Sequence, residues 1–236
     1  MSNIDLNQTL TLKVARVNIP RYIFSMDRLA PYHHGNLRKA LLDAAVALIG
    51  EVGPRGFTLR EVARRAGVSH NAPYRHFASK DDLLLAVAAE GFDRLAAVMR
   101  EAMVPGQSAR ERLELCGCGY VDFALRWPQH LLVMFDLPAR EREHCETGRP
   151  VPPIGEDAFR VLLDGIVAAQ EAGDLPAGDP QALAWTVWAL VHGIAKLATG
   201  GNLPLTAGET LAFTRTSAQA ILHGLSRAAQ ETPPIP

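Results

Sequence analysis

The run near residue 60 constrains this 236-residue chain most, because it predicts two short helices joined by a tight turn. Thr58 and Glu61 have capping-box spacing, so a helix should begin there, and small and branched apolar residues follow on one face. Gly67 supplies the left-handed backbone that ends this helix, and Ser69 is suited to cap the next one. The sequence therefore predicts a helix-turn-helix unit.

The second helix of this unit, expected from His70 to Phe77 with Ser69 as its N-cap, consists mostly of hydrogen-bond donors and aromatic residues. Phe77 and Ala66 are the residues expected to anchor this helix by packing on the other helices of the domain. Pro73 should be tolerated there, because a missing N–H costs nothing in the first turn of a helix. A helix that exposes this many hydrogen-bonding groups needs a partner for them, and the major groove of DNA admits a helix of this kind.

At these residues the sequence resembles the TetR family of bacterial transcription regulators, whose N-terminal module is a three-helix DNA-binding domain. The resemblance runs from Asn36 to Leu83. It rests on the approach Gly53-Pro54-Arg55-Gly56-Phe57-Thr58, the turn Ala66-Gly67-Val68-Ser69, the pair Tyr74 and Phe77, and Lys80. Trp188 and His192-Gly193 are similar to the Trp-His-Gly signature of one ligand-domain subgroup, and Trp127-Pro128 fits that subgroup. Pro73 departs from the family pattern, in which many members have an apolar helix former.

The resemblance and the apolar spacing together predict an all-α protein of about nine helices. The expected domains are an N-terminal extension (1–31), a helix-turn-helix DNA-binding domain (32–82), a helical ligand-binding and dimerisation domain (83–229) and a tail (230–236). A long helix from about Ser79 to Met103 should link the two domains. The last three helices are expected at 156–172, 179–199 and 206–229.

Charge is unevenly distributed along the chain, whose net charge is −1. Residues 32–80 contain eight Lys or Arg against three Asp or Glu, a net +5, whereas residues 81–236 contain twelve against twenty, a net −8. Phosphate affinity is therefore expected at the N-terminal end, and the acidic remainder should repel DNA.

The helix expected at 179–199 is apolar around nearly its whole circumference, so it needs burial on every side. One domain cannot easily supply that burial. Paired with the last helix, through residues such as Leu211, Ala218 and Leu222, it is expected to form a two-fold four-helix interface, as in the family. A homodimer also suits DNA binding, because two recognition helices about 34 Å apart read a palindrome.

Roles for the DNA-binding residues follow from their chemistry. Asn71 can pair bidentately with adenine and Ala72 can touch a thymine methyl group, and His70 and Asn71 are the expected base readers. Tyr74, His76, Lys80 and Thr58 are better suited to phosphates, which fix the register without reading sequence. Tyr74 and His76 could instead be packing residues with polar tips. The full expected set is Thr58, Ser69, His70, Asn71, Ala72, Tyr74, Arg75, His76 and Lys80.

A small-molecule pocket is expected in the C-terminal half, lined by large apolar side chains with a few polar points. His192 is the best single polar candidate, because it lies within an otherwise apolar helix. Each residue of the set could also be ordinary core, since helix faces in any bundle have this composition. The candidates are Tyr120, Phe123, Trp127, Met134, Phe159, Leu163, Trp185, Trp188 and His192.

Other chemistries find little support in the sequence. Cys116 and Cys118 are two apart on a helix and point to nearly opposite sides, so a shared metal or a disulfide is not expected. Cys145 could be an exposed thiol, and His33-His34 resembles a metal pair without a third ligand nearby. Phosphate-loop, His-Glu-x-x-His and Cys-x-x-Cys motifs are missing from the sequence, so neither an enzyme, a cofactor nor a metal is expected.

The N-terminal 31 residues match none of these patterns. Either Met26 is the true start or these residues form a loose arm, which could also grip a minor groove. Residues 138–155 are expected to form a loop or gate. The uninterrupted apolar runs, such as Leu83 to Ala89, are shorter than the roughly twenty residues of a membrane span, so we expect no membrane association and a cytoplasmic location.

These observations predict a homodimeric repressor that binds a double-stranded operator and is released by a small-molecule effector. A dimeric DNA-binding regulator that needs no ligand, and a ligand-activated activator, remain alternatives. Repression is what the family resemblance implies.

Overall fold

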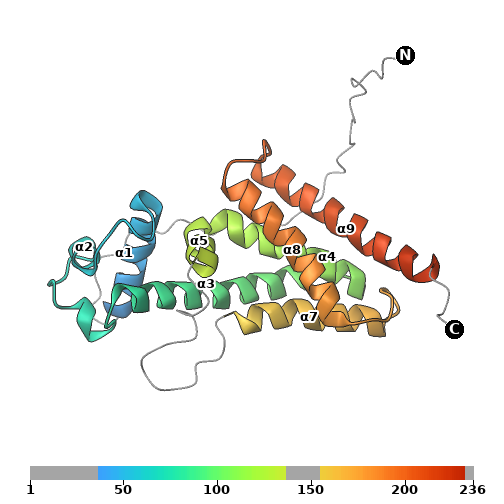
Figure 1. Cartoon of the computed structure of the whole chain (residues 1–236), viewed down its shortest axis with the longest axis horizontal. Coiled ribbons are helices and arrows are strands. Elements are labelled where there is room, and N and C mark those ends of the chain that lie inside the picture. The colour runs from blue at the N-terminus through green and yellow to red at the C-terminus, as the bar shows by residue number, and fades with distance from the viewer. Residues whose placement is uncertain (1–36, 137–154, 232–236) are drawn as a thin grey trace, which may run out of the picture. The chain divides into compact units, whose positions relative to one another are not determined.

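The computed structural model describes residues 37–136 and 155–231, and within these ranges it is all helical (Figure 1). These residues all belong to one compact unit, residues 33–236. The expected N-terminal arm, the choice between Met1 and Met26, His33-His34, Cys145 and nearly all of the expected gate lie outside the described residues. The elements are α1 (Leu37–Val52), α2 (Leu59–Arg65), the 3₁₀ helix η1 (Pro73–Arg75), α3 (Lys80–Met103), α4 (Ala109–Arg126), α5 (Pro128–Asp136), α7 (Glu156–Glu171), α8 (Pro180–Thr199) and α9 (Ala207–Glu231).

Helix α2 begins and ends as its sequence predicts. The Thr58 hydroxyl accepts the Glu61 N–H at 3.3 Å, and the Glu61 carboxylate accepts the Thr58 N–H at 2.7 Å, which completes the capping box. Gly67 has a φ of 70°. Beyond it, the Val68 N–H donates to the Ala63 carbonyl at 3.0 Å, as in a Schellman cap. The turn that sets the direction of the next segment is therefore encoded locally.

The expected helix from His70 to Phe77 is wrong in its extent, because the structure has only the three-residue η1 there. A helix capped at Ser69 would need the N–H of residue 73 to donate to the Ser69 carbonyl, and Pro73 has no N–H. The Ser69 carbonyl instead accepts the Ala72 N–H at 2.9 Å, and Ala72 precedes η1 without a side-chain cap. Pro73 therefore lies one residue too far into the helix to be harmless, and the recognition segment is a series of tight turns.

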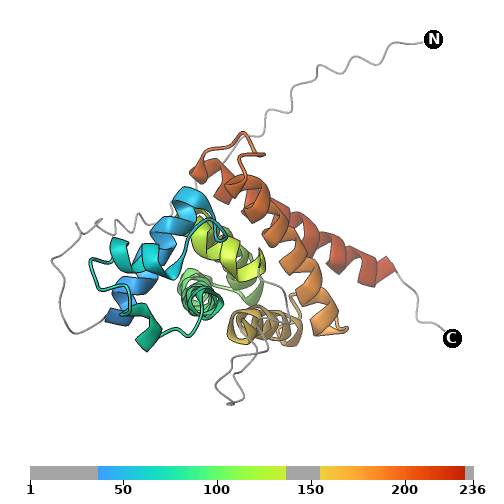
Figure 2. The same cartoon turned by 60° about the vertical axis from the view of Figure 1, so that its left-hand side comes forward.

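Helix α3 connects the N-terminal helices with the C-terminal ones (Figure 1). Ser79 and Asp82 form a capping box at its start. Its buried face continues from Leu83 to Met99, packing first on α1 and then on α4, α5 and α7. Seen nearly end-on in Figure 2, α3 and α7 lie side by side. A displacement of α3 at one end would consequently be transmitted to the other.

Helix α4 is central to the C-terminal helices and contacts α3, α7, α8 and α9. Its buried Glu114 accepts a hydrogen bond from the Gln219 amide at 2.9 Å and lies 3.6 Å from the Arg215 guanidinium. Both partners belong to α9. Because these contacts compensate the buried carboxylate, they fix the position of α9 against α4.

Helices α3 and α4 approach closely at Gly119. A Cβ atom there would lie 2.9 Å from the Ala102 Cβ and 3.1 Å from the Met99 Cα, closer than side chains normally approach. The obstacles include the backbone of α3, so no rotamer change relieves them.

We therefore expect Gly119→Ala to lower the free energy of unfolding by about 2 kcal/mol, because it forces the two helices apart. Urea denaturation measures the effect. Gly208→Ala in α9 is the matched control, since a Cβ there meets nothing within 4 Å and alanine favours the helix. Equal stability of the two variants would contradict the close packing.

Helix α8 buries only one face within a single chain. Ala184, Val187 and Val191 are buried, whereas Trp185 is 57% exposed and Leu197 is 46% exposed. By length and composition, α8 is the one described helix that could cross a membrane. That is weak evidence, because a core helix of a bundle passes the same test, and α8 packs on α4, α7 and α9.

Candidate functional site

The segment from Ser69 to His76 presents its polar side chains outward. Ser69, His70, Asn71, Arg75 and His76 are exposed, and Tyr74 is 53% exposed. Ala72 is partly buried, and only Pro73 and Phe77 are buried against the helices behind. The sequence-predicted base readers thus lie together on an accessible surface.

Tyr74 and His76 do not pack into the core. His76 lies beside Phe77, with ring centroids 6.3 Å apart, but its own side chain is exposed. Phe77 itself is buried and anchors this segment, with the Arg38 guanidinium 5.5 Å from its ring centroid. The exposure of Tyr74 and His76 favours the interpretation of surface contacts over that of packing residues.

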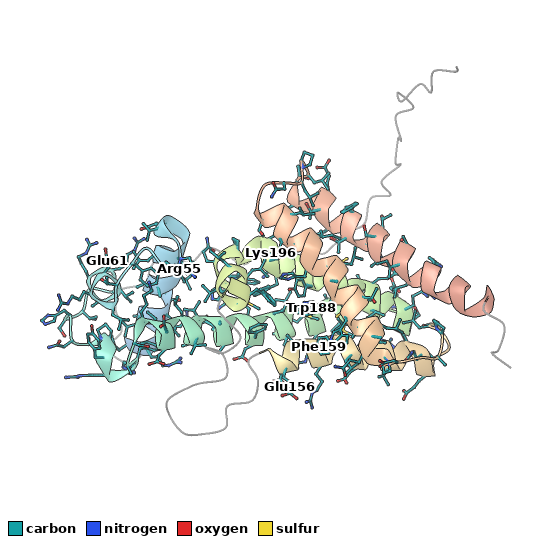
Figure 3. All side chains as sticks on the ribbon, viewed as in Figure 1. Arg55, Glu61, Glu156, Phe159, Trp188 and Lys196 are labelled. Carbon is teal, nitrogen blue, oxygen red and sulfur yellow. The ribbon has the colours of Figure 1, made fainter. Side chains whose placement is uncertain are left out.

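Lys80 and Thr58 already have partners in this structure. The Lys80 ammonium donates to the carbonyls of Arg55 at 3.2 Å and Phe57 at 3.1 Å, and it lies 4.9 Å from the Phe57 ring centroid. The Thr58 hydroxyl donates to the Glu61 carboxylate at 3.0 Å. Figure 3 labels Arg55 and Glu61, which lie at the α2 end of the molecule, on the left of the view. Lys80 and Thr58 therefore hold the approach to α2 in place, whatever they contact outside the chain.

A cavity of about 350 Å³ lies among the C-terminal helices, with predominantly apolar walls. In Figure 3, Trp188 of α8 and Phe159 of α7 lie close together, near Glu156 at the start of α7. Helix α3 contributes one wall, so the cavity adjoins the helix that carries the DNA-binding end. The lining residues are Phe92, Leu95, Met99, Cys116, Gly117, Tyr120, Phe135, Gly155, Glu156, Ala158, Phe159, Leu162, Gln181, Trp185, Val187, Trp188 and Val191.

Four of the nine sequence-predicted pocket residues line this cavity: Tyr120, Phe159, Trp185 and Trp188. Phe123, Trp127, Met134, Leu163 and His192 do not. Phe123 is fully buried in the core. The Trp127 ring contacts two guanidinium groups, those of Arg94 and Arg126, whose Cζ atoms lie 4.9 and 4.3 Å from its centroid. Met134 is buried where α5 crosses α3, and a Cβ at Gly91 would lie 2.6 Å from its sulfur.

Sequence reasoning missed Phe92 and Phe135. Both are aromatic residues on apolar helix faces, so composition could have nominated them. Which face of α3 or α5 borders the cavity depends on how the helices cross, and periodicity within one helix does not reveal that.

His192 lies behind the cavity wall and holds a residue that lines it. Its Nδ1 is 2.8 Å from the Tyr120 hydroxyl, and its ring contacts Phe135 edge-on at 4.5 Å. Burial, and secondarily the Lys196 charge, lower the pKa of His192. Burial raises the pKa of Tyr120 well above its ordinary value, despite a smaller opposing effect of Trp188. Both groups are therefore uncharged near neutral pH.

The two described cysteines face different surroundings. Cys116 lines the cavity, whereas the Cys118 thiol lies 3.9 Å from the Leu211 carbonyl of α9. Burial raises the pKa of Cys116 to about 12 and that of Cys118 to about 11. Protonated thiols are poor nucleophiles and poor metal ligands, so this geometry supports packing roles.

A helix-turn-helix end joined by one continuous helix to a helical domain with an apolar cavity is the architecture of a DNA-binding transcriptional regulator. Family models agree with it. The model for bacterial regulatory proteins of the tetR family matches residues 41–87, and that for a tetracyclin repressor-like C-terminal domain matches residues 113–221. The chain belongs to the TetR family of transcriptional regulators, which are not enzymes.

Curated relatives include regulators of several names. The regulator BetI of Agrobacterium fabrum is 30% identical over 60% of this chain and 80% of its own length. The repressor Rv1474c of Mycobacterium tuberculosis is 28% identical over 67% of this chain and 93% of its own length. The match to BetI of Rhizobium meliloti, at 40% identity, spans only 37% of that protein.

Solved structures share the fold. A Rhodococcus sp. RHA1 protein with unknown function is 34% identical, with a TM-score of 0.68 over 83% of this chain and 98% of that one. FadR of Bacillus subtilis, solved in complex with stearoyl-CoA, has a TM-score of 0.65 at 18% identity, over 79% of this chain and 98% of that one. At that identity the likeness concerns the fold alone. The Trp-His-Gly subgroup remains a prediction.

Proposed function

We propose that this regulator is a homodimeric repressor that binds a palindromic operator and releases it when a small molecule occupies the C-terminal cavity. The observation that carries the proposal is the exposed polar segment from Ser69 to His76, which a single continuous helix connects to the cavity. Repression is favoured by relatives named as repressors, Rv1474c and KstR, although the relative FasR is named an activator.

The proposed division of labour assigns DNA binding to residues 32–82 and ligand binding with dimerisation to residues 83–229. Helix α3 runs through the boundary and provides Phe92, Leu95 and Met99 to the cavity wall. A ligand that displaces this wall would tilt the DNA-binding end, so ligand and operator affinities oppose each other reciprocally. We also propose a cytoplasmic location, where operator DNA is accessible.

Within the DNA-binding end, we assign base reading to Ser69, His70, Asn71 and Ala72 and phosphate contacts to Tyr74, Arg75 and His76. Thr58 and Lys80 have internal partners, so any phosphate contact of theirs would be shared with those partners. The net positive charge of residues 32–80 supports this end as the DNA side.

Selection of duplexes from a random pool tests the DNA-binding role. We expect enrichment of a palindrome by the wild-type chain at fixed salt. For Asn71→Ala we expect lost discrimination at one base pair of each half-site, by about 1–3 kcal/mol, because a bidentate contact disappears. Asn202→Ala, an exposed asparagine in the turn after α8, is the matched control. A pool without an enriched site would contradict sequence-specific binding by the free protein.

Tyr74→Ala has a different expected result. Operator and unrelated duplexes should lose affinity by similar factors, since a phosphate contact carries no sequence information. Fluorescence anisotropy with both duplexes measures this. A loss confined to the operator would instead assign Tyr74 to base reading.

A further inference from the structure

Tyr120 of α4 lines the inner wall of the cavity, and His192 of α8 lies behind that wall as its hydrogen-bond partner. The Tyr120 side chain is 3% exposed and lines the cavity, and its hydroxyl is 2.8 Å from the His192 Nδ1. Glu156 and Gln181, the described lining residues with a carboxylate or an amide, are exposed, and the side chain of Trp188 already hydrogen-bonds to Tyr120. Polar recognition deep in the described wall therefore falls to the Tyr120 hydroxyl.

The surroundings of His192 fix its ring. Phe135 contacts it at 4.5 Å and Trp188 at 5.9 Å, between ring centroids, and these aromatic residues come from different helices. These two ring contacts keep the His192 Nδ1 directed at Tyr120, so the hydroxyl has a defined orientation. Whichever partner donates the proton, the tyrosine oxygen retains capacity for one further hydrogen bond, as donor or as acceptor.

The rest of the wall favours an uncharged ligand. Phe135, Phe159 and Trp188 form a chain of ring contacts, with centroids 6.1 and 6.2 Å apart. An ionised group brought against such a wall would lose its hydration without compensation. The Glu156 carboxylate is engaged by Arg160 of the same helix, so it is not a free counter-charge for a cation.

We propose that Tyr120, held by His192, is the specificity-determining residue of this cavity, which selects an uncharged, mostly apolar ligand with one hydroxyl or carbonyl group. The inference rests on the proposed sensor function and specifies its effector class. His192 is a positioning residue, because it acts through Tyr120 and does not line the cavity.

Titration calorimetry with matched probes tests this selectivity. One series is 2-naphthol, naphthalene and 2-naphthoate, and a second is 1-decanol, decanoate and decanoyl-CoA. We expect 2-naphthol or 1-decanol to bind. The preference for 2-naphthol over naphthalene should be about tenfold, as one buried hydrogen bond provides, and that for 1-decanol over decanoate at least as large, because the carboxylate would lose its hydration against the apolar wall. Binding by neither alcohol, or tighter binding of decanoate, 2-naphthoate or decanoyl-CoA, would overturn the proposal.

Variants identify the residues responsible. Tyr120→Phe should reduce the preference for 2-naphthol over naphthalene to about one, and Tyr74→Phe, outside the cavity, should leave it unchanged. His192→Leu should reduce it as well, whereas His192→Asn, whose amide can replace Nδ1, should restore most of it. A purely structural role of His192 would lower both affinities equally and leave their ratio intact, which would contradict the positioning role.

Operator binding by the ligand-free protein provides an independent readout. If the selectivity proposal fails, wild type and Tyr120→Phe still enrich the same palindrome. If the regulator proposal fails, no palindrome is enriched, whatever the cavity binds.

Discussion

Ala189→Glu on the exposed face of α8 is expected to convert the proposed dimer into a monomer and to weaken operator binding by at least about 100-fold, roughly 2.7 kcal/mol. Trp185, Ala189, Gly193 and Leu197 follow one another at intervals of four, so they share one face of the helix. Two of them are large and exposed, and Ala189 is exposed between them.

This face has the features of a helix–helix interface. A Cβ at Gly193 would meet nothing within 4 Å, so nothing in the described chain itself requires glycine there. Small residues at the centre of the face would let a second copy of α8 approach closely. On α9, which lies alongside α8 in Figures 1 and 2, Phe213 is 44% exposed. A carboxylate placed in such an interface would be desolvated without a partner, which costs several kcal/mol.

The measurements are the mass in solution by light scattering and operator affinity by anisotropy. Ala168→Glu is the matched control, because Ala168 is exposed on the charged outer face of α7, beside Asp164 and Glu171. That variant makes the same charge change and should remain dimeric, with wild-type operator affinity. A dimeric, fully active Ala189→Glu protein would exclude this face as the interface.

Helix ends were predictable from the sequence where local chemistry determines them. The capping box of Thr58 and Glu61 and the left-handed Gly67 act within one turn, so no tertiary information is needed. The recognition segment was predicted less well. Ser69 resembles an N-cap, but Pro73 four residues later removes the first helical hydrogen bond, and the segment forms η1. Counting four residues on from the N-cap Ser69 shows that Pro73 falls where a helical N–H is needed. The residue types alone do not show this.

The cavity was predictable in character and only partly in membership. Aromatic residues on helix faces indicate apolar walls. Trp127, however, packs against two arginines, and Met134 is buried where α3 and α5 cross. The same sequence signal that singled out His192, a histidine in an apolar helix, applies to His130 in α5, which sequence reasoning passed over.

His130 is expected to make the fold sensitive to acid. Its side chain is 3% exposed, and neither ring nitrogen has a hydrogen-bond partner among the described residues. Its pKa is lowered to about 4, mainly by burial; the positive charges of Arg94 and Lys39 also lower it, and the negative charges of Glu90 and Asp43 oppose them. These charges come from α3 and α1, the two helices of the DNA-binding end and linker that pack against α5.

The sign of the pH dependence follows from comparing the folded and unfolded chains. Below the ordinary histidine pKa of 6.5, the unfolded chain binds a proton at this residue that the folded chain refuses until about pH 4. Stability is therefore full above pH 6.5 and declines as the pH falls toward 4, by about 3 kcal/mol in total. Paired carboxylates titrate over part of the same range, so the wild-type curve alone does not isolate His130.

The variant His130→Leu isolates it. At pH 7 we expect stability equal to wild type or about 1 kcal/mol higher, because two unpaired buried nitrogens are replaced by an apolar group. Between pH 6.5 and 4 its free energy of unfolding should fall less steeply than that of wild type, by up to about 1.4 kcal/mol per pH unit. Urea denaturation at a series of pH values and one protein concentration measures both, since dimerisation makes stability depend on concentration. His76→Leu, which replaces an exposed imidazole and leaves the junction of α1, α3 and α5 unchanged, should parallel wild type. Parallel curves for His130→Leu and wild type would mean that the His130 ring is protonated equally in the folded and unfolded chains, and the α1, α3 and α5 junction would then have to admit water or a counter-charge to the ring.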